Sequence, residues 1–245
     1  MAYNHELSWA SLIKLISFLF WSGLYLKSTV NFPKRCPEWH SRVVTLLHGS
    51  VATIVGLSQC GLKNMTPMRF TMKITAGNYL LMVWSWGYFA FDLLWCLLYW
   101  TDSYLMLCHH ASALAAITVY MQKDFTGCTF PCTLALLELT NPLLQTRWFL
   151  RNEGFSQTYF YMVVEVTYLS LFLLVRGVFG TYALFKIMNS QIFDFDEKLI
   201  TVVFYMVSMA FIYDIVGYVF YRYKNKIGEF TDFLNEMGVI LNHQQ

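Results

Sequence analysis

Two adjacent histidines, His109 and His110, stand near the start of an apolar run at residues 104–121. A histidine side chain has an unperturbed pKa of about 6.5, which suits proton transfer at neutral pH. Desolvation in apolar surroundings favours the neutral ring, whose second nitrogen can accept a proton. The pair is therefore a candidate catalytic base that takes a proton from an alcohol or an amine. The alternative is that both rings only make hydrogen bonds between helices.

Asp92, in the preceding apolar run, is an acid that this chemistry can use. On a helix it shares a face with Trp95 and Tyr99, which follow it by three and seven residues. An acid beside aromatic hydrogen-bonding groups can orient an imidazole. We therefore predict that Asp92 acts with the histidine pair and that Trp95 and Tyr99 line the same cavity. The alternative is that a tyrosine or tryptophan simply caps Asp92 inside the protein.

The stretch ELTNPLLQTRW carries a polar stripe, because Glu138, Asn141 and Gln145 stand at helical positions i, i+3 and i+7. Pro142 cannot donate a backbone hydrogen bond, and its ring clashes with the carbonyl four residues earlier, which belongs to Glu138. A kink with an exposed carbonyl inside a polar stripe indicates a cavity wall. The alternative is that ionisable side chains on neighbouring helices pair with the stripe.

These residues lie in a chain with the composition of a membrane protein. Of 245 residues, 57% are hydrophobic and 13% are charged, and the mean hydropathy is +0.45; soluble domains are about 45–50% apolar and about 25% charged. Seven segments have about the length that crosses a bilayer as a helix. They are residues 8–26, 43–62, 77–100, 104–121, 128–150, 161–187 and 199–221. We therefore predict an all-α membrane protein, a multi-span bundle of about seven transmembrane helices.

Ionisable side chains are costly at membrane depth and usually face the interior of a bundle. The number of such groups in these segments predicts a central cavity of a lipid-binding type. Beyond the residues named above, its predicted lining includes His48, Glu165, Arg176 and Asp214. The alternative is that these groups pair across helices only to hold the bundle together, with the polar stripe matched to Arg176 or His48.

Several other classes of site are disfavoured. The net charge of +2 gives no reason to expect a nucleic-acid partner. The six cysteines are scattered and mostly lie in apolar runs, which predicts buried free thiols rather than a disulfide framework. Three histidines in the segments are too few for a membrane di-iron oxygenase, and no spacing supports zinc held by His48, His109 and an acid. We predict no metal and no resident cofactor.

Lysine and arginine indicate the orientation, since cytoplasmic loops are enriched in them. Residues 27–42, 101–103, 151–160 and the C-terminal tail share one side and hold eight of them, against five on the other side. The C-terminus is therefore predicted to be cytosolic, and the N-terminus and the sequon at Asn64 to be lumenal. Apolar residues at helical spacing after Arg222 predict an amphipathic helix in the tail, residues 223–245.

Four stretches read CPEWHSRVVTLLHG at 36–49, GYFAFDLLWCLLY at 87–99, LMLCHHASALAAI at 105–117 and ELTNPLLQTRWFLR at 138–151. In this order and spacing they resemble the TLC-domain family, which includes the ceramide synthases and the translocating-chain-associating membrane proteins. The resemblance implies a TLC domain over residues 36–222, after a first transmembrane helix and loop at 1–35. It also implies an endomembrane location, such as the endoplasmic reticulum, with membrane lipids as partners.

In ceramide synthases a histidine pair transfers an acyl group beside a lipid tunnel, and His109 and His110 match the position of that pair. The next part of the synthase signature, a His-Asp followed by a second Asp, departs here, because residues 137–141 read LELTN. The resemblance therefore favours a protein of lipid homeostasis that regulates membrane lipid composition and holds an acyl chain in its cavity. The alternatives are an acyltransferase related to ceramide synthase, with acyl-CoA as a substrate, and a transporter.

Overall fold

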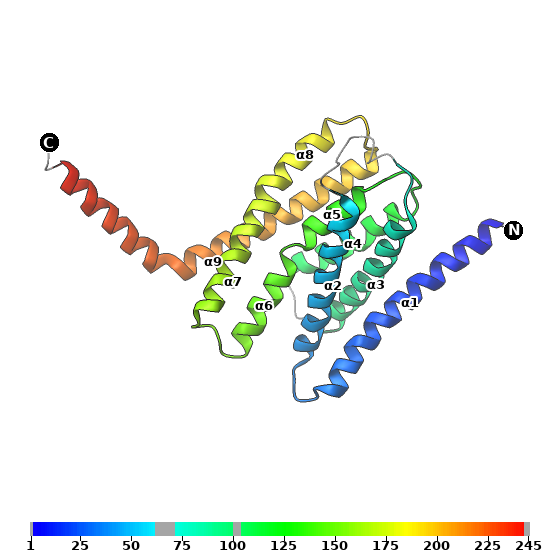
Figure 1. The fold of residues 1–245 in the computed structure, drawn as a ribbon, viewed down its shortest axis with the longest axis horizontal. Helices are drawn as coiled ribbons and strands as arrows, with labels where there is room; N and C mark the ends of the chain where they lie inside the picture. The colour runs from blue at the N-terminus through cyan, green and yellow to red at the C-terminus, as the bar shows by residue number, and fades with distance from the viewer. Residues whose placement is uncertain (1, 62–71, 100–103, 243–245) are drawn as a thin grey trace.

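The computed structural model describes residues 2–61, 72–99 and 104–242, and the side chains of residues 9–61, 72–99 and 104–224. Within these ranges the chain is helical and has no β-strand, which confirms the all-α prediction (Figure 1). The helices are α1 (Ala2–Asn31), α2 (Pro37–Cys60), α3 (Ala76–Tyr99), α4 (Tyr104–Tyr120), α5 (Thr129–Glu138), α6 (Asn141–Asn152), α7 (Tyr159–Phe172), the π-helix η3 (Leu173–Phe179), α8 (Gly180–Met188) and α9 (Phe195–Asn242).

Five helical stretches among the described residues are long and apolar enough to cross a membrane, so the chain is a multi-pass membrane protein. They are Trp9–Asn31, Pro37–Cys60, Ala76–Tyr99, Tyr159–Met188 and Phe195–Lys224. The predicted fourth segment forms α4, which has only 17 residues. The predicted fifth segment is divided between α5 and α6. Five stretches, against the seven predicted segments, therefore meet the length and composition of a span on their own.

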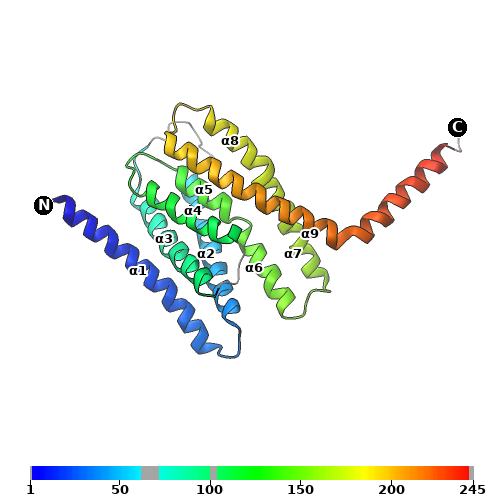
Figure 2. The ribbon, with the colours of Figure 1, turned by 180° about the vertical axis from the view of Figure 1, so that it is seen from behind.

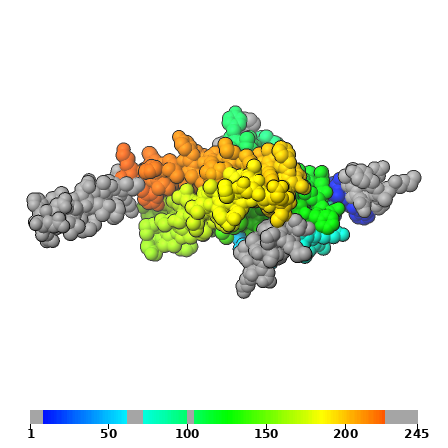
Figure 3. All heavy atoms as spheres, turned by 90° about the horizontal axis from the view of Figure 1, so that it is seen from above, coloured from blue at the N-terminus to red at the C-terminus, as the bar shows by residue number. Residues whose placement is uncertain are grey.

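Helix α2 is the element around which the others are arranged. It contacts α1 and α3, and it also packs along both α5 and α6. Helix α4 packs against both α3 and α9 (Figure 2). Helices α8 and α9 lie next to each other across the face seen in Figure 3. The contacts of α4, α5 and α9 with their neighbours enclose the space in which the candidate site lies.

The chain between α5 and α6 breaks where the sequence predicts a kink. Pro142 stands in the first turn of α6, where a missing backbone N–H is tolerated, but it prevents α5 from continuing through this point. Helix α5 ends at Glu138, and α6 begins three residues later at Asn141. The interruption therefore falls at the two polar residues that begin the predicted stripe.

The prediction of free buried thiols is wrong for one pair of cysteines. Cys60 at the end of α2 and Cys132 in α5 form a disulfide across 72 residues of sequence. Both are buried, with Cys128 packed beside them. The pairing depends on how closely α5 approaches α2, which the spacing of cysteines along the chain does not reveal. In the chain-entropy model, closing a loop of this length raises the free energy of unfolding by about 4 kcal/mol, because it lowers the conformational entropy of the unfolded chain.

Close packing of α5 on α2 depends on Gly56, and Gly56→Ala is expected to disturb it. A Cβ at this position would lie 2.8 Å from the carbonyl oxygen of Pro131 and 2.9 Å from Cβ of Ala135. Overpacking of this kind costs about 1–3 kcal/mol, so the Tm of the detergent-purified protein should fall. Gly217→Ala is the matched control, since nothing lies within 4 Å of a Cβ there. An unchanged Tm for Gly56→Ala would contradict this contact.

The connections at the disulfide end of the bundle are tied together. The backbone N–H of Ile74 donates to the carbonyl of Asp124, and that of Gly127 to the carbonyl of Met72. Lys123 bonds Asp194 and Asp196, ahead of and at the start of α9, at 3.1 and 2.8 Å. Burial lowers the pKa of Lys123, but these carboxylates outweigh burial and hold that pKa above its ordinary value. The lysine therefore stays charged and fixes the start of α9.

The helix α9 continues past the predicted transmembrane segment as far as Asn242, so the tail after Arg222 is helical. The side chains that make residues 223–245 amphipathic lie, from residue 225 on, outside the described side chains. The sequon at Asn64 also lies outside the described residues.

Candidate functional site, two chambers that share a wall

A cavity of about 490 Å³, here called the polar chamber, lies toward the end of the bundle at which α2 begins. The three catalytic candidates Asp92, His109 and His110 all line it. Six of the predicted cavity residues line it as well: Trp95, Glu138, Asn141, Gln145, Arg176 and Asp214. Residues from α3, α4, α5, α6, η3 and α9 thus converge on one space.

Asp92 and His110 form a buried carboxylate–imidazole pair. His110 Nε2 lies 3.1 Å from Asp92 Oδ2, and both residues are buried. Tyr88, one helical turn before Asp92, donates its hydroxyl to the same Oδ2 at 3.1 Å. The other ring nitrogen of His110, Nδ1, has no hydrogen-bond partner. The carboxylate therefore holds the imidazole through Nε2 and leaves Nδ1 buried without a hydrogen-bond partner.

The polar stripe forms a continuous chain of hydrogen bonds from the helix break to the start of α2. Asn141 donates to Glu138 Oε2 at 2.8 Å, and Gln145 donates to Asn141 Oδ1 at 2.9 Å. Arg42 then donates to Gln145 Oε1 at 3.0 Å. At the inner end, Nδ1 of His48 lies 3.8 Å from Glu138 Oε2. The sequence alternative that pairs the stripe with His48 thus describes a contact that exists, although the stripe also lines the chamber.

Arg176 donates a hydrogen bond to a backbone carbonyl at the break between α5 and α6. Its Nη2 donates to the carbonyl of Leu137 at 2.6 Å, and its Nη1 to the hydroxyl of Ser208 at 3.4 Å. The carbonyl that Arg176 satisfies is therefore the one before Glu138, not that of Glu138 itself as the proline argument suggests. Arg176 lies in the π-helix η3, a geometry often found at functional sites. The guanidinium Nε is buried without a partner.

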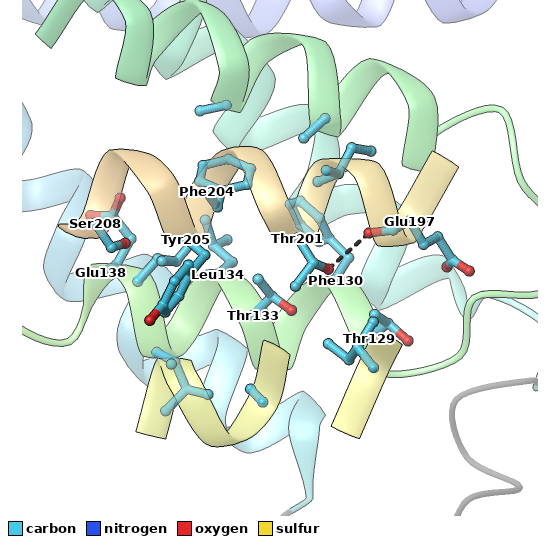
Figure 4. Close-up of a pocket in the computed structure, with 18 of the residues that line it drawn as sticks. Thr129, Phe130, Thr133, Leu134, Glu138, Glu197, Thr201, Phe204, Tyr205 and Ser208 are labelled. Carbon is cyan, nitrogen blue, oxygen red and sulfur yellow. Dashed lines mark hydrogen bonds between the residues drawn. The ribbon is translucent and has the colours of Figure 1, made fainter. Parts of the chain in front are cut away.

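A second cavity of about 160 Å³, here called the apolar chamber, extends from the polar one toward the disulfide end. Aliphatic and aromatic side chains of α4, α5, α8 and α9 make up most of its wall. Figure 4 shows Leu134 and Phe204 beside this space, with Glu138 and Ser208 at one end and Glu197 at the other. The apolar chamber is thus a hydrocarbon-lined space with polar groups at its two ends.

The two chambers share a wall of five residues: Phe89, His109, Leu137, Glu138 and Arg176. The ring centroids of His109 and His110 are 5.4 Å apart; both residues line the polar chamber, and only His109 also borders the apolar one. His109 also contacts the rings of Phe204 and Phe211 on α9. The boundary between polar and apolar surroundings therefore runs through the histidine pair and the helix break.

Residues 38–225, most of the chain, match the TLC domain. The chain belongs to the TLC-domain family. The match includes the residues that line both chambers. Together with the apolar helices, it makes this a multi-pass membrane protein of a lipid-related family. Helix α1 and the part of α9 after residue 225 lie outside the matched residues.

Three residues of the TLC domain that the sequence places in the cavity lie elsewhere. Tyr99 is 44% exposed, stacks on Trp95 and meets Tyr25. His48 is fully buried and stacked on Tyr88 at 3.8 Å, behind the chamber wall. Glu165 is 1% exposed and belongs to a separate cluster. A polar residue in a predicted span therefore does not have to line the cavity, because its position depends on how its helix packs against the others.

The cluster around Glu165 joins α6, α7 and α9 at the end of the TLC domain where α2 begins. Three tyrosine hydroxyls at 2.6–2.9 Å and two arginines at 3.0 Å contact its carboxylate. These partners are Tyr161, Tyr218, Tyr223, Arg147 and Arg222. One carboxylate thus holds three helices together. For Glu165 this agrees with the alternative that ionisable groups in the spans pair across helices to stabilise the bundle.

Sequence reasoning missed several members of the TLC domain's site. Tyr88 stands four residues before Asp92, a spacing that places both on one helix face, and this signal was available. Arg42 and Phe89 gave no signal, because one lies near a helix end and the other is an ordinary apolar residue. No three His, Cys, Asp or Glu side chains among the described residues are grouped to hold a metal ion.

Proposed function

We propose that this protein binds a membrane amphiphile across its two chambers. The head group lies in the polar chamber and the adjoining part of the hydrocarbon chain in the apolar chamber. The observation that carries the proposal is the shared wall, where His109, Glu138 and Arg176 border both cavities. A ligand that changes from polar to apolar along its length matches such a boundary. This activity fits a role in lipid homeostasis and in regulating membrane lipid composition within the endomembrane system.

The sizes of the chambers limit what each can hold. At about 490 Å³, the polar chamber is within the range of about 300–1,000 Å³ usual for small-molecule sites. At about 160 Å³, the apolar chamber resembles an apolar cavity of about 150 Å³ that binds benzene. It therefore accommodates a short stretch of chain rather than a complete long acyl chain. The rest of such a chain extends toward the bilayer.

Unpaired donors in the polar chamber indicate the chemistry of the head group. The Nε of Arg176 is a buried N–H donor without a partner. Nδ1 of His109 is buried without a partner as well, whereas Nδ1 of His110, whose Nε2 faces the Asp92 carboxylate, is an unpaired acceptor. Leaving a buried donor unsatisfied costs about 1–3 kcal/mol. A head group with acceptor oxygens, such as an ester, an amide or a hydroxyl, removes this cost.

We also propose that the chain crosses the membrane seven times. Helices α5 and α6 together follow the whole of α2, since Cys132 is linked to Cys60 at one end and Gln145 bonds Arg42 near the other. They therefore cover the depth of that 24-residue span as a broken helix. The 17 residues of α4 are about 25 Å long, close to the thickness of the hydrocarbon layer.

The proposal is tested by blocking the apolar chamber. Ala116 is buried in its wall, whereas Ala115 is exposed on the outer side of the same helix. We expect lipid to co-purify with the wild-type protein and with Ala115→Phe, as measured by mass spectrometry. Ala116→Phe should reduce it about tenfold, which corresponds to about 1.4 kcal/mol of binding free energy. Equal lipid in all three proteins, or none in the wild type, contradicts the proposal.

A second candidate function is acyl transfer, which the Asp92–His110 pair favours. With Asp92 holding Nε2, the free Nδ1 of His110 can take the proton of an alcohol or amine that attacks an acyl carbonyl. His109 stands at the chamber boundary, where that carbonyl would lie. Acyl-CoA is the acyl donor that the family resemblance suggests.

This second candidate is tested with acyl-CoA and a set of alcohol and amine acceptors. A functional base predicts product formation that falls by about 10²–10⁴ in His110→Gln and in Asp92→Asn. The lipid content of the purified variants separates the two functions. Bound lipid without any turnover leaves the first proposal standing and removes the second.

A further inference from the structure

We infer that the Cys60–Cys132 end of the bundle faces an oxidising compartment and that the polar chamber opens toward the cytosol. The chamber then takes the head group of its amphiphile from the cytosolic leaflet. The sidedness of the bundle stands by itself. The statement about the ligand rests on the proposed function.

The disulfide gives the direction. Forming it removes two electrons and two protons from two thiols, and the oxidant comes from the thiol–disulfide oxidoreductases of the secretory pathway. The cytosol keeps thiols reduced, whereas the lumen of the endoplasmic reticulum and the cell exterior preserve disulfides. Cys60 ends α2 at the left-handed cap of Gly61, and Cys132 lies in the first turn of α5. Both cysteines are therefore near a helix end, where the oxidoreductases of the oxidising compartment can reach them during folding.

Other segments belong to the same end as the disulfide. The turn around Gly127 that precedes α5 bonds Asn78 in the first turn of α3. Lys123 of the same connection bonds Asp196 at the start of α9. The starts of α3, α5 and α9 and the ends of α2 and α4 thus lie on the oxidising side. Since α9 begins there, its other end emerges on the cytosolic side.

The polar chamber lies toward the opposite end. Its lining includes Glu38 and Arg42 in the first turns of α2, and Arg147 and Arg151 in the last turns of α6. Arg35 and Glu153 form an ion pair that joins the two connections of this end. Arginine and lysine are enriched on cytosolic faces, so the charge of this end agrees independently with the disulfide. The other end of the bundle borders the apolar chamber. Its mainly aliphatic and aromatic wall does not suit the entry of a polar head group.

The inference is tested with one introduced reporter cysteine at a time in the full chain, expressed in cells. Exposed Asn152 ends α6, and exposed Gln191 lies between α8 and α9, so each reports one end. Cys36→Ser and Cys108→Ser remove two exposed thiols from the background. A membrane-impermeant maleimide is applied to intact cells, to cells opened with digitonin, and after detergent. Non-reducing mass spectrometry looks for the Cys60–Cys132 peptide.

We expect Asn152→Cys to react first when digitonin opens the plasma membrane. Gln191→Cys should react either in intact cells or only after detergent, and the linked peptide should be present. Gln191→Cys reacting first with digitonin overturns the sidedness, as does alkylation of both Cys60 and Cys132 without a reductant.

Leu144→Cys, on the wall of the polar chamber, tests the opening itself. A small charged methanethiosulfonate should modify it once digitonin is present. Modification only from the other side, or none at all, overturns the cytosolic opening. Co-purification of lipid in detergent does not depend on sidedness, so failure here and failure of the proposed function are distinguishable.

Discussion

Glu165→Gln is expected to cause the largest loss of stability of any single polar substitution considered for this protein. The side chain is 1% exposed, and its carboxylate contacts two arginines and three tyrosines from α6, α7 and α9. Glutamine keeps the shape but removes the charge, so Arg147 and Arg222 lose their common partner. Breaking a buried pair in this way costs about 3 kcal/mol or more.

The measurement is thermal unfolding of the detergent-purified protein, where about 3 kcal/mol lowers the Tm by about 6–12 °C for a chain of this length. Glu153→Gln is the matched control. Its ion pair with Arg35 has side-chain exposures of 35% and 42%, so its loss should cost less than about 1 kcal/mol. Equal shifts for the two variants would mean that the Glu165 cluster does not hold these helices together.

Arg176→Met is expected to affect both stability and ligand binding. The substitution keeps an unbranched side chain but removes the donor to the Leu137 carbonyl and the cation beside Glu138. The unsatisfied carbonyl at the helix break costs about 1–3 kcal/mol. Because Arg176 borders both chambers, the head group of the bound amphiphile also loses a donor.

Both effects are measured on one preparation, as the Tm and as lipid content by mass spectrometry. Arg35→Met is the control, because Arg35 lines neither chamber and its ion pair with Glu153 is half-exposed. We expect it to change the Tm little and to retain the lipid. A normal lipid content in Arg176→Met would argue that Arg176 has only a structural role at the break.

The five long apolar helices could be predicted because each depends on a local property, the length of an apolar run. The same holds for the break before α6, since Pro142 acts on its own helix. The exact carbonyl that needed a new donor was not predictable. It depends on where α5 ends and on the position of Arg176 in η3, which is 39 residues away from Leu137 in sequence.

Depth along a helix is the second limit. Asp92, Trp95 and Tyr99 do share a face, but Tyr99 is seven residues, or about 10 Å, further along the axis than Asp92. It therefore meets Tyr25 at the end of the bundle instead of the chamber. Glu165 illustrates the same problem, because a buried acid in a cavity wall and one in a structural cluster look alike in sequence.

Contacts between distant segments are the third limit. The Cys60–Cys132 disulfide joins residues 72 apart and follows from the approach of α5 to α2 at Gly56. The division of the interior into a polar and an apolar chamber likewise depends on how Phe89, His109 and Leu137 meet between them. No periodic pattern in one segment contains this information.

Photo-crosslinking with an amphiphile that carries a diazirine in its acyl chain tests the central claim most directly, since it reports where the chain lies. The claim predicts crosslinked peptides from the apolar chamber, at residues such as Leu134 and Phe204, and loss of these crosslinks in Ala116→Phe but not in Ala115→Phe. Crosslinks confined to outward-facing residues such as Leu19 and Val166, and equal in both variants, would contradict it.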